Sequence, residues 1–228
     1  MSENEDLNPG EKTKVAHGEL YDSLSAEYDA WFEGEGRLTF DIEVRAFREI
    51  LSRLPKPRLE VGVGSGRFAQ ALGSEMGLEP SANMARMAKA RGVGVVRGIG
   101  EQLPFKAETF GTIFMIVTLC FVNAPLEVFR EARRVLRPGG KLALGCVLSD
   151  THCGRLYQEK KERGHRYYKY ATFYSFAEVN SLLERAGFSV ERVISTLFQK
   201  PGEVEFNEPP RDGFSPDAGF TIILAGRQ

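Results

Sequence analysis

The sequence predicts an α/β fold in which a mostly parallel sheet lies between two layers of helices. Short apolar strands alternate with helical patterns along most of the chain, which is the order that builds parallel strands with crossover helices. Residues 109–119 are almost continuously apolar and β-branched, as expected of a central strand covered on both faces. The last two strands, 190–197 and 220–225, have no helical pattern between them, so we expect an antiparallel pair.

The composition is that of one globular domain. With 228 residues and 42% hydrophobic side chains, the chain can bury a single core. A net charge of -1 gives no general attraction to nucleic acid or to anionic membranes. No apolar run reaches the roughly 18 residues of a membrane span, and the three cysteines fit a reducing compartment. We therefore expect a cytoplasmic protein, with a flexible leader over 1–16 and a single domain over 17–228.

Two cap helices are expected within residues 17–54, before the first strand. The first begins near His17 and ends near the aromatic pair at 31–32. The second, 38–54, has an apolar face formed by Ile42, Ala46, Phe47, Ile50 and Leu54. Glu43, Arg45 and Arg48 are expected off that face. Pro55 and Pro57 end the helix.

The remaining elements follow in order. Beyond the first strand, at 59–61, strands are expected at 76–79, 93–97, 109–119, 142–147, 190–197 and 220–225. Helices begin near Phe68, after Ser81, at Pro125 and at Ser175, where Ser175 and Glu178 have the spacing of a capping box. The connection 199–218 is long and rich in Pro and Gly, so we expect it to be mobile.

The first strand runs directly into three alternate glycines. Glu60 lies on the strand, and Gly62, Gly64 and Gly66 follow it. Glycine adopts positive φ and lets a ligand approach the backbone, because it has no Cβ. Glu79 ends the next strand, where a carboxylate can accept hydrogen bonds from both hydroxyls of a ribose. The alternative is that Glu79 is simply exposed at the strand end.

This stretch resembles motif I of the class I S-adenosylmethionine-dependent methyltransferases of small-molecule type. Those enzymes have an acid, one spacer residue and then Gly-x-Gly-x-Gly, whereas a dinucleotide-binding loop would need glycine at position 67, where this chain has Arg67. Residues 135–142 resemble motif III of the same family, and residues 98–105 resemble its adenine loop, with Ile99 where an aspartate is usual. The resemblance implies a three-layer α-β-α sandwich around a seven-stranded Rossmann-like sheet whose last strand is antiparallel.

The resemblance also implies S-adenosyl-L-methionine as the cofactor. The glycine loop would lie against its methionine and ribose portion, Glu60 would face the ammonium group, Glu79 would hold the ribose, and Gly100 and Glu101 would flank the adenine. The residues implied to bind the cofactor are Glu60, Gly62, Val63, Gly64, Ser65, Gly66, Glu79, Pro80, Gly100, Glu101, Leu119 and Tyr28.

Tyr28–Asp29 and Tyr21–Asp22 are two candidates for a segment that folds over the cofactor; alternatively, these rings pack on the sheet edge. Residues 149–174 mix basic and aromatic side chains. This insertion is expected to be a lid over a small-molecule acceptor, a solvated helix with tyrosines beneath it, or a surface that stacks nucleic acid.

Two smaller sets of residues carry alternatives. Cys120, Cys146 and Cys153, with His152, form a thiol or metal site or are ordinary buried thiols. His152 and His165 are either general bases or surface residues.

We therefore expect a methyltransferase that transfers a methyl group to an unidentified small molecule, with no metal, nucleic acid or membrane partner. The sequence assigns no catalytic residue and no oligomeric state. A nicotinamide-dependent oxidoreductase and a non-catalytic cofactor-binding regulator are the alternatives.

Overall fold

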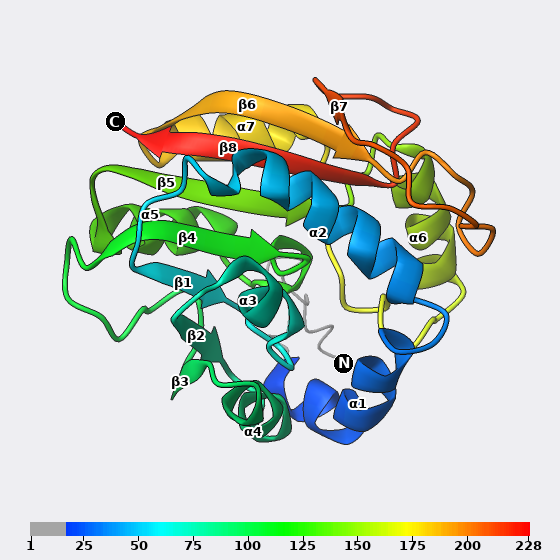
Figure 1. Cartoon of the computed structure of the whole chain (residues 1–228), viewed down its shortest axis with the longest axis horizontal. Helices are drawn as coiled ribbons and strands as arrows, with labels where there is room; N and C mark the ends of the chain where they lie inside the picture. Colours follow the sequence, from blue (N-terminus) through cyan, green and yellow to red (C-terminus); the bar gives the residue numbers. More distant parts are fainter. Residues whose placement is uncertain (1–16) are drawn as a thin grey trace, which may run out of the picture.

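One eight-stranded sheet runs through the molecule in the order β3-β2-β1-β4-β5-β8-β6-β7, as seen in the computed structural model, which describes residues 17–228 (Figure 1). The flexible leader expected over 1–16 lies outside the described residues. The strands are β1 Arg58–Val61, β2 Met76–Glu79, β3 Gly94–Arg97, β4 Phe110–Ile116, β5 Leu136–Cys146, β6 Phe188–Thr196, β7 Arg211–Asp212 and β8 Phe220–Arg227.

The strand pairing confirms the predicted α/β sheet. Strands β1 to β5 pair parallel to one another. The last strand, β8, is antiparallel to β5 and to β6. As predicted, β4 lies at the centre and is buried along its whole length. Its apolar, β-branched sequence follows from the helices that cover both of its faces.

The prediction of seven strands was wrong by one. The additional strand, β7, has two residues and pairs with β6 at the sheet edge, so it is too short for any periodicity to reveal it. It lies in the connection 199–218, which we expected to be mobile. The Glu208 carboxylate also holds this connection, because it accepts hydrogen bonds from the backbone N–H of Phe198 at 2.8 Å and of Gln199 at 3.2 Å.

Helices cover both faces of the sheet and the edge at which the parallel strands end. They are α1 His17–Trp31, α2 Arg37–Leu51, α3 Arg67–Leu72, α4 Ala82–Ala90, α5 Pro125–Val135, α6 His152–Glu162 and α7 Phe176–Arg185, with a 3₁₀ turn, η1, at Leu119–Phe121. Helices α2 and α3 pack on one face and α5 and α7 on the other (Figure 1). The predicted capping box is confirmed at the start of α7, where Ser175 and Glu178 bond reciprocally.

The parallel strands direct their carboxyl ends toward the side of the molecule that carries α1 and α6 (Figure 1). Open α/β sheets bind ligands at this edge, because the loops that leave the strands meet there. Among the described helices, none has both the length and the apolar character that a membrane span requires.

Candidate functional site

The glycine loop between β1 and α3 has one open position and two closely packed ones. Gly62, Gly64 and Gly66 all have positive φ, at 71°, 54° and 87°. A Cβ on Gly62 would lie 2.5 Å from the Thr118 side chain, and one on Gly66 would lie 2.8 Å from Ala88. A Cβ on Gly64 would meet nothing within 4 Å. Gly64 therefore borders free space, whereas Gly62 and Gly66 permit close packing of the loop against Thr118 and Ala88; that the loop lies against a ligand stays a prediction.

Glu79 faces this open glycine. Its side chain is only 6% exposed, so the alternative of an exposed strand-end carboxylate is wrong. Its two oxygens accept hydrogen bonds from the backbone N–H groups of Gly64 and Ser81, both at 2.9 Å. Burial raises the pKa of Glu79 even though these two hydrogen bonds favour the charged form.

Glu60 supplies a second buried carboxyl group at the same edge. It is 2% exposed, and its Oε2 atom has no hydrogen-bond partner among the described residues. Burial, and then the negative charge of Glu79, raise the pKa of Glu60 well above its ordinary value. A buried polar atom without a partner is rare in a folded protein, and here it is a carboxylate oxygen suited to a cationic group.

The other residues implied around the glycine loop form its frame. Val63 and Ser65 are buried. The Val63 N–H donates to the carbonyl of Leu78 at 3.0 Å, and the Ser65 carbonyl accepts from Arg91 Nη1 at 2.8 Å. Pro80 follows Glu79 with its side chain half-buried. These contacts fix the loop to β2 and α4.

Gly100, Glu101 and Leu119 lie in the next two loops along this edge. A Cβ on Gly100 would be 3.2 Å from the side chain of Val61, so this glycine permits close packing over β1. The Glu101 carboxylate accepts from the backbone N–H of Asn123 at 2.8 Å, and it therefore fastens the loop before α5. Leu119 is buried in η1.

Helix α1 is fastened over the glycine loop by two aspartates. The Asp29 carboxylate accepts hydrogen bonds from Arg67 Nε at 2.7 Å and from Arg91 Nη2 at 2.7 Å. Burial opposes ionisation of Asp29, but hydrogen bonds from Arg67, Ser65 and Arg91 outweigh it and lower the pKa to about 2. Asp22 accepts from the Ser81 hydroxyl and, at 2.9 Å, from the N–H of Asn83.

Arg67 is thus a site residue that the sequence reading did not assign. The sequence signal that could have drawn attention to Arg67 is its position, since it occupies the place of the third glycine in a dinucleotide-binding loop. Its partner Asp29 lies 38 positions away in the chain, so the motif alone does not reveal the pair.

Tyr28 lies on α1 and is half-buried. Its ring packs edge-on against Phe32, with the centroids 5.2 Å apart, and at a tilt against Tyr167 at 6.4 Å. Burial raises the pKa of Tyr28, and the charges of Glu43 and Glu79 add to this effect. The ring therefore packs against other aromatic side chains, as one alternative expected.

Glu43 is buried, which corrects the prediction that it lies off the apolar face of its helix. It is 8% exposed and lies among Ile42, Val44, Ala46 and Phe47, which are all buried residues of α2. Burial raises the pKa of Glu43 from 4.5 to about 8. The helical periodicity predicted that this position faces solvent. It could not show that elements from distant parts of the chain cover the position.

Among the described residues, the three cysteines and His152 are not arranged as metal ligands. Cys146 and Cys153 are buried and Cys120 is half-buried; burial raises the pKa of Cys146 to about 12 and that of Cys153 to about 11, so both remain thiols at neutral pH. Within residues 17–228 no group of three or more side chains is arranged to hold a metal ion. His152 is exposed.

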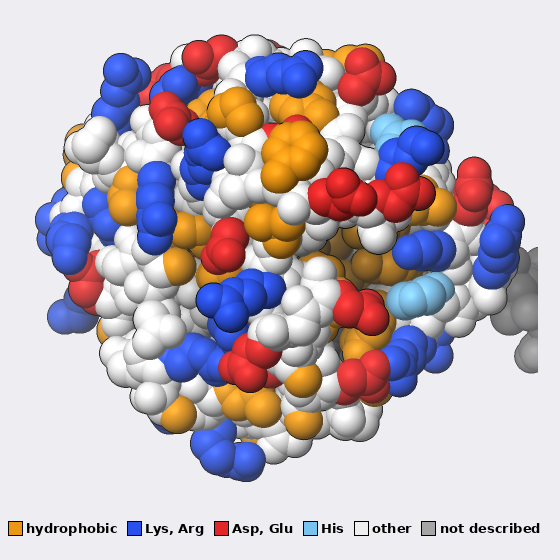
Figure 2. All heavy atoms as spheres, turned by 45° about the vertical axis from the view of Figure 1, so that its right-hand side comes forward, with side chains coloured by type: hydrophobic (Ala, Val, Ile, Leu, Met, Phe, Trp, Pro, Cys, Tyr) orange, Lys and Arg blue, Asp and Glu red, His pale blue; other side chains and the backbone are white. Residues whose placement is uncertain are grey.

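The molecule is hollowed on the face to which the strands point, with apolar side chains in the hollow and charged and histidine side chains at its rim (Figure 2). Under this face, at the ends of β4 and β5, a small cavity of about 20 Å³ is lined by residues that include Leu119, Cys120, Cys146 and Tyr174. Its volume corresponds to about one water molecule.

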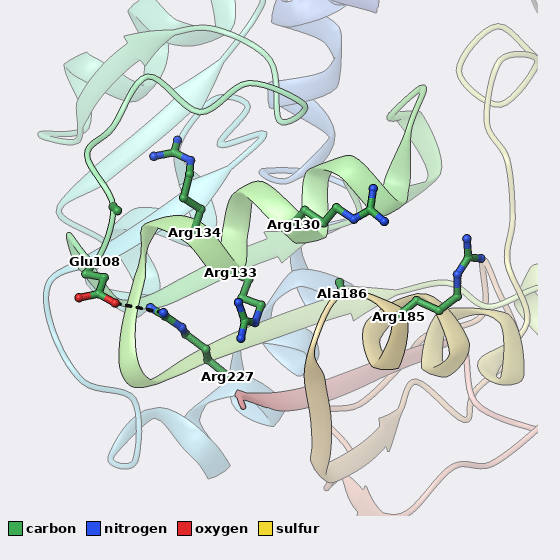
Figure 3. Close-up of a pocket in the computed structure, with 8 residues that line it drawn as sticks. Glu108, Arg130, Arg133, Arg134, Arg185, Ala186 and Arg227 are labelled. Atoms are coloured by element: carbon green, nitrogen blue, oxygen red, sulfur yellow. Dashed lines mark hydrogen bonds and ion pairs between the residues drawn. The ribbon is translucent and has the colours of Figure 1, made fainter.

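A larger cavity, of about 380 Å³, lies away from the glycine loop and is lined mainly by arginines (Figure 3). Most of these arginines already have partners. Arg134 pairs with Glu131 at 2.7 Å and Arg227 with Glu108 at 3.0 Å, while Arg133 donates to the carbonyl of Gln228 at 2.9 Å. This cavity lies where β5 begins and β8 ends. We therefore assign these arginines a structural role, in which they hold loops and strand ends together.

Known proteins resemble this chain in sequence and fold. The profile of a family described as "Methyltransferase domain" matches residues 59–144. A crystal structure from Thermotoga maritima, described as an S-adenosylmethionine-dependent methyltransferase and possible histamine N-methyltransferase, is 36% identical with a TM-score of 0.86. The match covers 92% of this chain and 99% of that one.

The chain belongs to the S-adenosylmethionine-dependent methyltransferase family.

Uncharacterized relatives extend the similarity. One from Mycobacterium tuberculosis is 42% identical over 88% of this chain and 71% of its own length. Another, from Methanocaldococcus jannaschii, is 36% identical over 90% of this chain and 98% of its own length.

The cofactor of this methyltransferase is S-adenosyl-L-methionine. Two observations on the chain fit that molecule. Gly64 borders free space that a Cβ would enter, and the buried Oε2 atom of Glu60 has no partner within the described residues. The first suits close backbone approach by a ligand, and the second suits an ammonium group.

Proposed function

We propose that this protein transfers the methyl group of S-adenosylmethionine to a small-molecule acceptor bound under residues 149–174. The observation that carries the proposal is the open Gly64 position with the buried carboxyl groups of Glu60 and Glu79 beside it. Acids at the ends of neighbouring strands, next to a glycine turn, suit a ligand that carries both a cationic group and a ribose.

Each residue of this edge then has a role. Glu79 accepts hydrogen bonds from the ribose hydroxyls, and Glu60 accepts from the ammonium group directly or through water. The backbone of 62–66, with Val63 and Ser65, lies along the cofactor, and Pro80 follows the ribose.

The adenine lies between the loops of Gly100 and Leu119 in this proposal. Ile99 is 52% exposed beside them, so its side chain is available to cover an aromatic base. Glu101 positions the loop beside the adenine, because its carboxylate already accepts a hydrogen bond from the backbone N–H of residue 123.

Tyr28 covers the cofactor from α1, which Asp29 and Arg67 hold in place. Residues 149–174 cover the acceptor. S-adenosylmethionine supplies an activated methyl group when bound. The chain therefore needs to align the acceptor atom, about 3 to 3.5 Å from the reacting carbon, and to exclude water. No nucleophilic side chain is required for this chemistry.

A thermal-shift comparison tests the proposal. S-adenosylhomocysteine should raise the melting temperature of the full chain, whereas NAD should not, because a ligand that binds the folded state stabilises it by mass action. Stabilisation by NAD alone would indicate the oxidoreductase alternative.

Turnover is the second measurement. A panel of small acceptors should be incubated with S-adenosylmethionine and followed by mass spectrometry for the gain of one methyl group. The Thermotoga maritima protein is described as a possible histamine N-methyltransferase, so small amines belong in the panel. Binding without turnover across a metabolite extract would favour the non-catalytic regulator.

A further inference from the structure

The larger cavity carries more positive charge than its structural contacts use. Of the eight described residues that line it, five are arginines and one, Glu108, is an acid. Figure 3 shows that the arginines come from three elements: Arg130, Arg133 and Arg134 from α5, Arg185 from α7 and Arg227 from β8. Like charges gathered around one space repel one another, so this arrangement favours an anion among them.

Three of the five arginines form an ion pair with an acidic side chain. These pairs are Arg130 with Glu127 at 2.6 Å, Arg134 with Glu131 at 2.7 Å and Arg227 with Glu108 at 3.0 Å. Arg133 and Arg185 have no side-chain carboxylate as a partner in the part of the chain that the structure describes. Two guanidinium groups of the cavity are therefore not neutralised by acidic side chains.

The backbone holds the guanidinium group of Arg133 at this cavity. Gly187 follows α7 with a φ of 82°, and a Cβ at Gly187 would lie 2.6 Å from Arg133 Nε. Arg133 Nη2 donates to the main-chain oxygen of Gln228 at 2.9 Å. The buried Nε atom has no hydrogen-bond partner among residues 17–228, and a buried donor without an acceptor costs stability. Arg133 is therefore held in place and still has N–H donors that the fold does not use.

Arg185 supplies the second guanidinium group. It is the last residue of α7, two positions before Gly187, and its side chain is exposed. Its side chain forms no hydrogen bond or ion pair within the described residues. The end of a helix favours a cation, but this preference does not require that Arg185 line the same cavity as Arg133. The end of α7 thus carries one free guanidinium group and packs against a second.

We propose that this cavity binds a phosphorylated small molecule, whose phosphate group accepts hydrogen bonds from Arg133 and Arg185. A phosphate monoester carries about −1.5 to −2 charges at pH 7 and three acceptor oxygens, whereas a carboxylate carries one charge. The phosphate therefore matches two guanidinium groups, each of which can donate two parallel hydrogen bonds to it. The volume of about 380 Å³ is typical of pockets that hold small molecules.

The cavity is separate from the proposed cofactor site. It lies where β5 begins, whereas the glycine loop and Glu79 lie where β1 and β2 end. Because β1, β2 and β5 run parallel to one another in the sheet, the two places lie at opposite edges of it. Binding of a phosphate here is therefore compatible with an occupied cofactor site, and the inference does not depend on the proposed function.

Isothermal titration calorimetry in a buffer of low ionic strength tests the inference. The probes are inorganic pyrophosphate and a matched pair, glycerol 3-phosphate and glycerate, each with and without saturating S-adenosylhomocysteine. Pyrophosphate and glycerol 3-phosphate should bind. Glycerate should bind at least about 10-fold more weakly, because it offers one charge and fewer acceptor oxygens to the two arginines. S-adenosylhomocysteine should leave the affinity for phosphate unchanged.

Three variants locate the ligand. Arg133→Gln and Arg185→Gln each remove one positive charge from the cavity, and each should weaken pyrophosphate binding about 5- to 10-fold, since a partly exposed charge pair contributes less than a buried one. Arg48→Gln changes an exposed arginine of α2, on the other face of the sheet, and should bind pyrophosphate as the wild type does. If Arg133→Gln does not fold, the exposed Arg185 decides, because its replacement breaks no contact.

Several outcomes would overturn the inference. It fails if neither small phosphate binds, or if Arg185→Gln binds pyrophosphate as tightly as the wild type. Equal affinity for glycerol 3-phosphate and glycerate would remove the assignment to phosphate, and competition with S-adenosylhomocysteine would place the anion in the cofactor site. A short single-stranded RNA that binds when the small phosphates do not would indicate a nucleic-acid surface instead. If pyrophosphate binds as expected but S-adenosylhomocysteine does not bind, the proposed function fails and this inference stands.

Discussion

The burial of Glu43 makes the stability of the chain depend on pH in a way that one substitution removes. In the folded chain the pKa of Glu43 is about 8, whereas its ordinary value is 4.5. The folded state therefore binds more protons than the unfolded state between these values, and stability falls as the pH rises through this window. Glu43→Gln has no ionisable group at this position, so its stability should lack this component.

The size of the effect follows from the same values. One pKa unit corresponds to about 1.4 kcal/mol, so a pKa raised from 4.5 to about 8 destabilises the ionised form by about 5 kcal/mol. Below pH 4.5 this contribution is absent, because Glu43 is protonated in both states. Above pH 8 it is complete. The free energy of unfolding of Glu43→Gln should therefore rise relative to wild type across the interval.

Urea unfolding of both chains at intervals between pH 5 and pH 9 measures the difference directly. Other titrating groups are common to both chains and cancel in the comparison. Glu49→Gln, on the exposed side of α2, should follow the wild-type curve within about 0.5 kcal/mol. A constant difference between Glu43→Gln and wild type over this range would refute the argument, since Glu43 would then ionise as it does in water.

Three further predictions concern the cofactor side of the site. Glu79→Ala should weaken S-adenosylhomocysteine binding roughly 10- to 150-fold, because charge-assisted hydrogen bonds contribute about 1.5 to 3 kcal/mol; unchanged affinity by calorimetry in a folded variant would remove Glu79 from the site. Gly64→Ala should lose binding at a moderate cost in stability, since its positive φ strains any side chain although its Cβ enters free space, whereas Gly66→Ala should lose more stability because its Cβ meets Ala88, as thermal unfolding with and without S-adenosylhomocysteine would show. Asp29→Asn should be less stable than wild type at pH 7 by about 2 kcal/mol, since the pKa of Asp29 is lowered from 3.8 to about 2, and this difference should shrink between pH 4 and pH 2; a difference that stays constant under urea unfolding would exclude the ion pair with Arg67 as its source.

The features that the sequence predicted well depend on neighbouring residues. The glycine turn follows from the spacing of 62, 64 and 66, the capping box from Ser175 and Glu178, and the central strand from an unbroken apolar run. Each of these patterns is specified within about ten residues, because backbone conformation and burial on both faces leave direct traces in composition. The order of such elements was then sufficient to predict the α/β sheet.

The features that it missed depend on distant residues. Glu43 reads as a solvent-facing position of an amphipathic helix, yet its side chain is buried, and its charge acts on Tyr28, Cys153 and Tyr157 from other helices. Likewise, the ion pair between Asp29 and Arg67 joins residues 38 positions apart. Periodicity describes one helix against one sheet, and it carries no information about a second layer that covers the helix from another part of the chain.

The mistaken prediction for Glu43 is therefore informative about function. Positions at which a local rule fails without a packing benefit are expected at sites that bind or react. Three buried carboxyl groups, Glu43, Glu60 and Glu79, come from three different elements, and burial raises the pKa of each. In the proposed function Glu60 faces the ammonium group of the cofactor, which would restore the charged form that burial disfavours, whereas Glu79 accepts hydrogen bonds from the ribose hydroxyls.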